Sequence, residues 1–296
     1  MKVTVMNNKL LAASLCLFSI NSYAGISDIK ASNNQLGIQF VSSKVDYKET
    51  FTDGTLADTE KSRISGFGLS ANLMKDVFLG NDYFKAQYSR TEGGLDYVGS
   101  VGVPGIAYGG GTFYGSNTQE NNATITDFNF RYGKGFEIND KLMITPYGEL
   151  GHHEWLRDLG NACLLGARAT CSSSEKYTHY HYGLGGLVQY SPIQNLVFNV
   201  DALIGRTFSS QISGQGVELV TISNPSSSFK QDLGDKNLYK IGISADYAFT
   251  SRIHGNIGVD YVDFEYGKSD VFNTYAYEPD SKTNYTNIKL GIGYAF

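Results

Sequence analysis

The segment YTNIKLGIGYAF, residues 285–296, decides how the rest of the chain is interpreted. Every second residue in it is apolar or aromatic: Ile288, Leu290, Ile292, Tyr294 and Phe296. The residues between them are polar or small. This period of two predicts a β-strand with one apolar face.

The same alternation recurs in nine earlier segments: 36–40, 67–73, 84–88, 127–132, 142–157, 177–190, 196–208, 239–249 and 253–261. Short links are expected at 74–82, 137–141, 191–195 and 250–252, and long links at 48–63, 91–122, 158–175, 209–236 and 267–283. An even strand number and alternating short and long links are typical of membrane β-barrels. We therefore predict an all-β fold, a ten-stranded antiparallel transmembrane β-barrel with long extracellular loops and short periplasmic turns. Twelve strands stay possible if parts of 91–122 also pair.

The N-terminal segment predicts export. Lys2 and Lys9 precede an apolar stretch from Leu10 to Ile20, and the segment ends in Ser-Tyr-Ala at residue 24. A basic start, a short apolar stretch and small residues at the end mark a cleaved signal peptide. We assign residues 1–24 to this signal and residues 25–296 to the barrel domain.

Composition agrees with a barrel and argues against other classes. The chain has 21 Tyr, 17 Phe and 34 Gly, and its mean hydropathy is −0.23. No later stretch of 18 apolar residues predicts a membrane-spanning helix. The chain has 24 Lys and Arg residues against 29 Asp and Glu, and Lys2 and Lys9 leave with the signal, so the mature domain is acidic. This balance disfavours binding to nucleic acid.

Taken together, these segments resemble the bacterial outer-membrane β-barrel proteins of the opacity and small-porin type. The resemblance implies a protein in the outer membrane of a Gram-negative bacterium, exported through the periplasm and surrounded by lipid and lipopolysaccharide. The sequence leaves the oligomeric state open, with a monomer favoured. In that group, a last strand ending as this one does, with Tyr294 and Phe296, serves as a signal to the outer-membrane assembly machinery.

Aromatic residues are expected at both borders of the membrane, because their rings tolerate the boundary between hydrocarbon and headgroups. Phe136, Tyr190, Phe249 and Phe296 fall beside short links. Trp155, with Tyr88, Phe208 and Tyr239, is a candidate for the second border.

The opposite face of the strands carries mixed charges, which we expect to pair and fill a narrow lumen. The predicted lumenal polar network comprises Glu149, His153, Arg157, His179, His181, Asp201, Lys240, Asp246, Asp260 and Lys289. On this interpretation His153 lies beside His179 or His181, and the histidines have no catalytic or metal-binding duty. A metal site is the alternative for the same histidines.

Two cysteines remain after the signal, Cys163 and Cys171. Closely spaced cysteines in an exported chain predict a disulfide. It would lie at the tip of the third long loop.

The functional prediction is a surface protein with a structural or interaction role through its extracellular loops, including a possible surface or host ligand. A narrow porin or channel for small solutes is one alternative. A surface hydrolase like the omptin proteases is another, but their Asp-His pair has no match, since no Asp-x-His occurs on a candidate rim. We expect no enzyme activity and no cofactor, and the sequence names no ligand.

Overall fold

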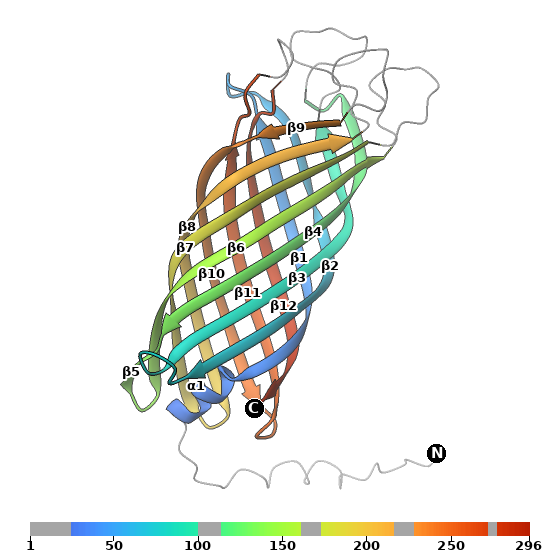
Figure 1. The fold of residues 1–296 in the computed structure, drawn as a ribbon. Helices are drawn as coiled ribbons and strands as arrows, with labels where there is room; N and C mark the ends of the chain where they lie inside the picture. The colour runs from blue at the N-terminus through green and yellow to red at the C-terminus, as the bar shows by residue number, and fades with distance from the viewer. Residues whose placement is uncertain (1–24, 100–113, 161–172, 216–227, 272–276) are drawn as a thin grey trace, which may run out of the picture.

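The computed structural model describes residues 25–99, 114–160, 173–215, 228–271 and 277–296. They form one short helix and twelve strands (Figure 1). The elements are α1 (Ile26–Ser32), β1 (Gln35–Thr50), β2 (Leu56–Lys75), β3 (Asp82–Gly99), β4 (Asn117–Lys134), β5 (Phe136–Asn139), β6 (Leu142–Gly160), β7 (Ser173–Ile193), β8 (Leu196–Gln215), β9 (Ser228–Asp232), β10 (Gly234–Ala248), β11 (Ile253–Gly267) and β12 (Asp280–Ala295).

Ten of these strands close into an antiparallel barrel, as the sequence predicted. The order is β1, β2, β3, β4, β6, β7, β8, β10, β11 and β12, and β12 pairs back onto β1. The short strands β5 and β9 add only to the ends of β6 and β8. Closure leaves the ten long strands without a free edge, which a β-structure in lipid requires.

The strands are longer than the alternation indicated. The expected link at 48–63 is mostly strand, because β1 continues to Thr50 and β2 begins at Leu56. Likewise β3 and β4 stay paired as far as Gly99 and Asn117. The paired parts of 91–122 therefore extend β3 and β4, and they add no new strand to the barrel wall. The outward residues of these extensions are polar, so the apolar signal stops before the strand does.

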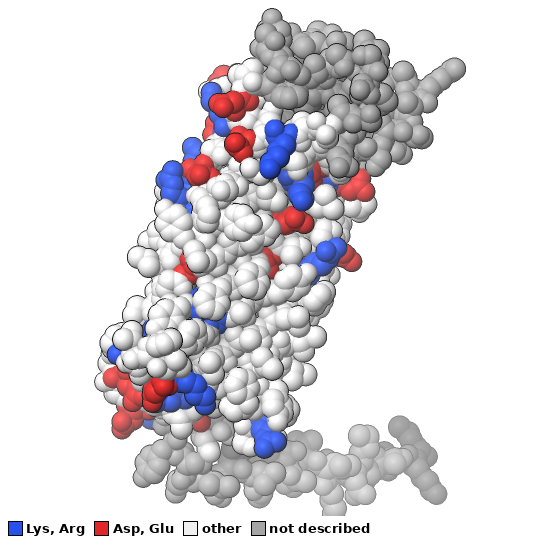
Figure 2. All heavy atoms as spheres, in the orientation of Figure 1, with Lys and Arg blue, Asp and Glu red and all other residues white. Residues whose placement is uncertain are grey.

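The outer wall carries a broad apolar belt. In Figure 2 its middle is largely free of charged side chains, which gather above and below it. Leu184, Ile204 and Ile243 are 77%, 69% and 62% exposed there. Such exposure would be costly in water, about 25 cal/mol for each Å² of apolar surface. Among the described residues, no helix is long and apolar enough to span a membrane.

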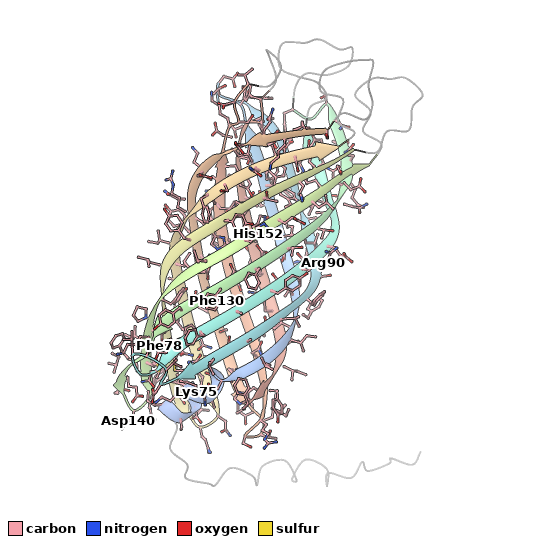
Figure 3. The ribbon with its side chains drawn as sticks, in the orientation of Figure 1. Lys75, Phe78, Arg90, Phe130, Asp140 and His152 are labelled. Carbon is pink, nitrogen blue, oxygen red and sulfur yellow. The ribbon has the colours of Figure 1, made fainter. Side chains whose placement is uncertain are left out.

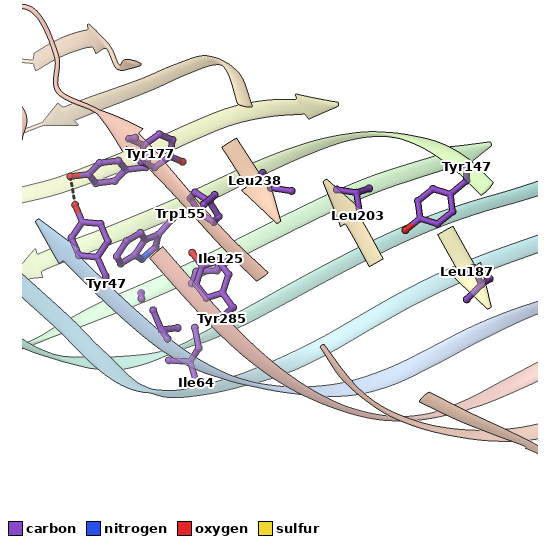
Figure 4. Packing of buried hydrophobic residues seen from close by; sticks show 14 of the residues in the cluster. Tyr47, Ile64, Ile125, Tyr147, Trp155, Tyr177, Leu187, Leu203, Leu238 and Tyr285 are labelled. Carbon is purple, nitrogen blue, oxygen red and sulfur yellow. Dashed lines mark hydrogen bonds between the residues drawn. The ribbon is translucent and has the colours of Figure 1, made fainter. Parts of the chain in front are cut away.

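A layer of apolar side chains crosses the upper part of the lumen (Figure 4). Each of the ten barrel strands contributes one residue that is at most 4% exposed. These ten residues, here called the apolar layer, are Tyr47, Ile64, Leu95, Ile125, Trp155, Tyr177, Ile212, Leu238, Phe264 and Tyr285. Adjacent rings touch across the lumen, with Tyr47 and Trp155 centred 4.8 Å apart.

The position of Trp155 corrects the sequence interpretation. It was expected at the lipid border, but it is fully buried in the apolar layer. Trp155 shares its parity with Glu149 and His153 on β6, and those side chains also point inward. Because side chains alternate between the two faces of a strand, this parity already excluded a lipid-facing tryptophan.

Helix α1 covers the lower end of the lumen, near the C-terminus in Figure 1. The sequence analysis did not predict it. Ile29 is fully buried, and the Asp28 carboxylate accepts hydrogen bonds from Ser191 Oγ and from the Asn195 backbone at 3.1 and 3.2 Å. Directly after the helix, Asn33 donates to Gln189 at 2.6 Å. These contacts fix the helix to strand ends on the opposite wall.

Candidate functional site

A polar cavity of about 210 Å³ lies in the middle of the lumen. Ser32 and Asn33 line it from below, and Leu238, Phe264 and Tyr285 of the apolar layer line it from above. A cavity of this size has room for several water molecules. The cavity therefore separates two closures, the helix end beneath it and the apolar layer above it.

A charge-matched group, here called the lower network, lies on the cavity wall around Glu149. The carboxylate of Glu149 receives hydrogen bonds from Arg131 Nε at 2.5 Å and from Lys240 Nζ at 2.7 Å, and His181 Nε2 lies 3.1 Å from it. Arg131 also donates to Asp201 at 2.7 Å. Each charge thus has an opposite charge in contact, as a buried ionic group needs.

The remaining cavity histidines make compact pairs. His153 and His179 stack with ring centroids 4.9 Å apart, so the predicted neighbourhood is confirmed. His153 Nδ1 lies 2.8 Å from the Asp127 carboxylate, and His179 Nδ1 lies 2.7 Å from the Tyr266 hydroxyl.

Three other predicted residues form two separate pairs. Lys289 contacts Asp260 at 2.7 Å. Asp246 lies near the helix end of the cavity, 2.6 Å from His254 Nδ1. The predicted residues below the apolar layer are thus brought together in small groups around one cavity.

Arg157 belongs to a different environment, which corrects the prediction of a single network. It follows Trp155 on β6 and lies above the apolar layer. Its Nε and Nη2 donate to Glu60 at 3.0 and 2.6 Å, and its Nη1 donates to Glu175 at 2.9 Å. Glu49 and Asp58 lie 3.8 and 3.7 Å from the guanidinium.

A tyrosine hydroxyl links this group to a fifth carboxylate. The Tyr177 hydroxyl accepts from Arg157 at 3.1 Å and lies in hydrogen-bond contact with Glu278 and Glu49. We call Arg157 with its five carboxylates, Glu49, Asp58, Glu60, Glu175 and Glu278, the upper cluster. One cation here faces five carboxyl groups, whereas the lower network has as many carboxylates as basic groups of fixed charge.

The upper cluster lies beyond the apolar belt. On the outer wall at this level, Lys61 pairs with Asp46 at 3.2 Å and Lys176 pairs with Glu154 at 3.5 Å. These ion pairs lie on the same strands as the cluster. Charged residues on both faces of the wall place this part of the barrel outside the hydrocarbon.

Burial and mutual repulsion perturb the cluster carboxyls. Burial, followed by repulsion from Glu49, raises the pKa of Asp58 and that of Glu278 well above the usual value. Burial also raises the pKa of Glu175, although the Arg157 charge opposes this. Asp58 Oδ1 and Glu60 Oε2 are buried without a hydrogen-bond partner. Among the described residues, no group of His, Cys, Asp or Glu is arranged to hold a metal ion.

The other predicted sites are at the chain ends or outside the described residues. Tyr294 and Phe296 face outward and are 45% and 60% exposed. Cys163, Cys171 and the signal segment 1–24 lie outside the described residues. Sequence reasoning missed the five carboxylates of the upper cluster, which fell in expected links. If the alternation of β1 and β2 had been continued into the expected link 48–63, it would have placed Glu49 and Glu60 in the lumen.

No protein-family model and no curated protein matches this sequence. Solved structures do match. The outer-membrane protease OmpT of Escherichia coli aligns with a TM-score of 0.55 and 9% identity over 90% of this chain and 98% of OmpT. The chain has the fold of an outer-membrane β-barrel protein. Neisserial surface protein A also aligns, at a TM-score of 0.30 and 9% identity over 88% of this chain and 97% of that one. The toluene transporter TodX of Pseudomonas putida aligns at 0.29 and 10% identity over 91% of each chain.

Proposed function

We propose that the protein is a non-conducting β-barrel of the Gram-negative outer membrane that acts at the cell surface through its upper, extracellular end. The apolar layer is the observation that carries this proposal. Every barrel strand contributes a buried apolar side chain to this part of the lumen, which supports a lumen closed to solutes. Helix α1 adds a second closure below the cavity. The fold and the outer apolar belt support the location.

We do not propose an OmpT-like proteolytic activity. OmpT is a protease, but a similarity of fold at 9% identity assigns no role to residues of this chain. The pairs His153–Asp127 and His254–Asp246 contain histidines that are 2% exposed, and both lie below the apolar layer. A polypeptide substrate has no access to them there.

The proposed partners are the lipids around the barrel and the assembly machinery. Lys44 and Arg63 face each other directly across β1 and β2, and both are exposed just above the apolar pair Phe40 and Phe67. Like charges in directly opposite positions destabilise a sheet unless an anion neutralises them. A phosphate group of lipopolysaccharide has the required charge. The exposed aromatic end at Phe296 supports recognition during assembly.

Conductance in planar lipid bilayers tests the proposal. Wild-type protein should give no stable single-channel steps. A variant with the apolar layer opened, Trp155→Ala with Tyr177→Ala and Phe264→Ala, should conduct, whereas deletion of residues 25–33 alone should stay silent because the layer persists. Circular dichroism of each variant verifies that the barrel is folded. Large, stable steps from the wild type would refute the non-conducting role in favour of the narrow channel.

A further inference from the structure

The turn between β2 and β3 differs from the other turns at the lower end of the barrel. Three consecutive apolar residues are exposed in it: Val77 by 50%, Phe78 by 74% and Leu79 by 59%. The other lower turns have no such run: Phe136 and Ile138 are both exposed but are separated by Glu137, and Ile193 and Phe249 each lie next to polar turn residues. A run of three exposed apolar residues is an interaction surface that the barrel wall itself does not need.

Buried and local polar groups hold this turn in one conformation. The Asp82 carboxylate accepts hydrogen bonds from the backbone N–H groups of Val77, Phe78 and Leu79 at 3.0, 2.8 and 2.9 Å. The Asn81 N–H donates to Asp76 at 2.7 Å. Gly80 and Asn81 adopt left-handed φ angles of 78° and 51°, which reverse the chain. The three apolar side chains therefore project outward from a fixed backbone.

Because of the same hydrogen bonds, these backbone groups of the turn do not depend on water as a hydrogen-bond partner. Four backbone donors bind the two carboxylates, and Lys134 Nζ donates to the Leu79 carbonyl at 2.6 Å. In water, an exposed turn has no need of internal partners. In a lipid leaflet every unpaired backbone group costs several kcal/mol, so internal partners become necessary. The bonding of this turn fits a lipid surface better than an aqueous one.

The turn is also continuous with the apolar belt. The outward-facing Tyr132 donates its hydroxyl to the other oxygen of Asp82 at 2.9 Å, and its ring packs against Phe84 with centroids 5.0 Å apart. In Figure 3, Phe78 lies at the side of the barrel toward its lower end, whereas Asp140 lies at the bottom. The turn thus extends the lipid-facing surface sideways.

We propose that Val77, Phe78 and Leu79 insert into the periplasmic leaflet of the membrane and anchor the lower rim of the barrel in lipid. This inference rests on the outer-membrane location proposed above and adds the leaflet as the specific partner of one turn. The exposed Lys75 and Asp76 precede the apolar run, where they can remain at the level of the headgroups.

Site-specific tryptophan quenching tests this anchor. The only native tryptophan, Trp155, is first replaced by Phe, and Phe78→Trp is then introduced. Two matched variants in the same background are Leu184→Trp on the belt and Gln194→Trp in the β7–β8 turn. Each variant is reconstituted into lipid nanodiscs containing either ordinary phosphatidylcholine or phosphatidylcholine with brominated acyl chains. Iodide serves as the aqueous quencher, because nanodiscs expose both faces to it.

The proposal predicts that brominated lipid reduces the fluorescence of Phe78→Trp to an extent comparable with Leu184→Trp, and that iodide quenches mainly Gln194→Trp. Phe78→Trp quenched by iodide as strongly as Gln194→Trp, and not by brominated lipid, would overturn the anchor while the belt control still reports lipid. Failure of brominated lipid to quench Leu184→Trp would instead contradict the membrane location, and the anchor with it.

Discussion

The lower network and the upper cluster both contain buried charged groups, but they differ in how these charges are compensated. In the lower network Glu149 is in contact with Arg131, Lys240 and His181, so the anion is neutralised by its neighbours. In the upper cluster Arg157 alone serves five carboxylates. The first group is complete by itself, whereas the second depends on protons taken from solution. The two groups should therefore respond differently to mutation and to pH.

The largest effect is expected from Arg157→Met, which removes the only cation of the upper cluster. Removing one partner of a buried ion pair costs about 3–5 kcal/mol, because the remaining charges stay buried. Urea unfolding of the vesicle-bound protein, followed by Trp155 fluorescence, measures this loss at pH 7. The loss should shrink at pH 5, because the raised pKa values of Asp58, Glu175 and Glu278 favour their protonation as the pH falls. Arg63→Met, on the outer wall, is the matched control. A loss below about 1 kcal/mol would contradict the central role of Arg157.

A smaller loss is expected from Glu149→Gln in the lower network. Hydrogen bonds to charged groups contribute about 1.5–3 kcal/mol, and Arg131 keeps its contact with Asp201 after the change. The same unfolding assay should therefore show a loss of about 2–3 kcal/mol, with Glu154→Gln on the outer wall as the control. Acid should not restore this variant, since the groups left behind are cations. Recovery at pH 5 equal to that of Arg157→Met would remove the distinction between the two sites.

The third effect is a gain. The raised pKa of Asp58 means that the folded state holds its proton more tightly than the unfolded state, where the pKa is about 4. The contribution of this group to stability is thus full below about pH 4 and is lost as the pH rises through the folded pKa. Asp58→Asn removes this pH-dependent loss and should raise the unfolding free energy at pH 7.

The urea assay across pH 4–8 checks the Asp58→Asn prediction. The variant and the wild type should converge at the acid end and separate toward pH 8. Asp46→Asn, an outward carboxylate paired with Lys61, should show no such separation. A variant less stable than the wild type at pH 7 would mean that Asp58 is satisfied as an anion after all.

The barrel itself was predictable because its signal is local. Alternation assigned faces correctly even in the polar strands, so His179 and His181 were placed inside from parity alone. The parity of Trp155 also predicts an inward side chain, but we assigned it to the lipid border because aromatic residues are common there. Local patterns state which face a residue occupies, and that information sufficed for most of the lower network.

Height and partners across the lumen were not predictable in the same way. Arg157 and Glu149 have the same parity, yet the apolar layer lies between them. Which residues meet across a barrel depends on the shear between strands, and no single strand encodes it. Glu49 and Glu278 come together from distant parts of the chain for this reason. Helix α1 was missed because seven residues are too few for a helical period to be recognised.

The seam between β1 and β12 joins the two ends of the barrel domain. All 16 residues of β1 pair with β12, from Gln35 with Ala295 to Thr50 with Asp280, and the Phe296 N–H then donates to the Asn34 carbonyl. No other strand pair of the barrel is so far apart in sequence, so this closure costs the most loop entropy and we expect it to form last. Until then the nascent sheet has two bare edges, each able to capture another chain. We therefore expect a longer lifetime of the open sheet to increase the risk of aggregation.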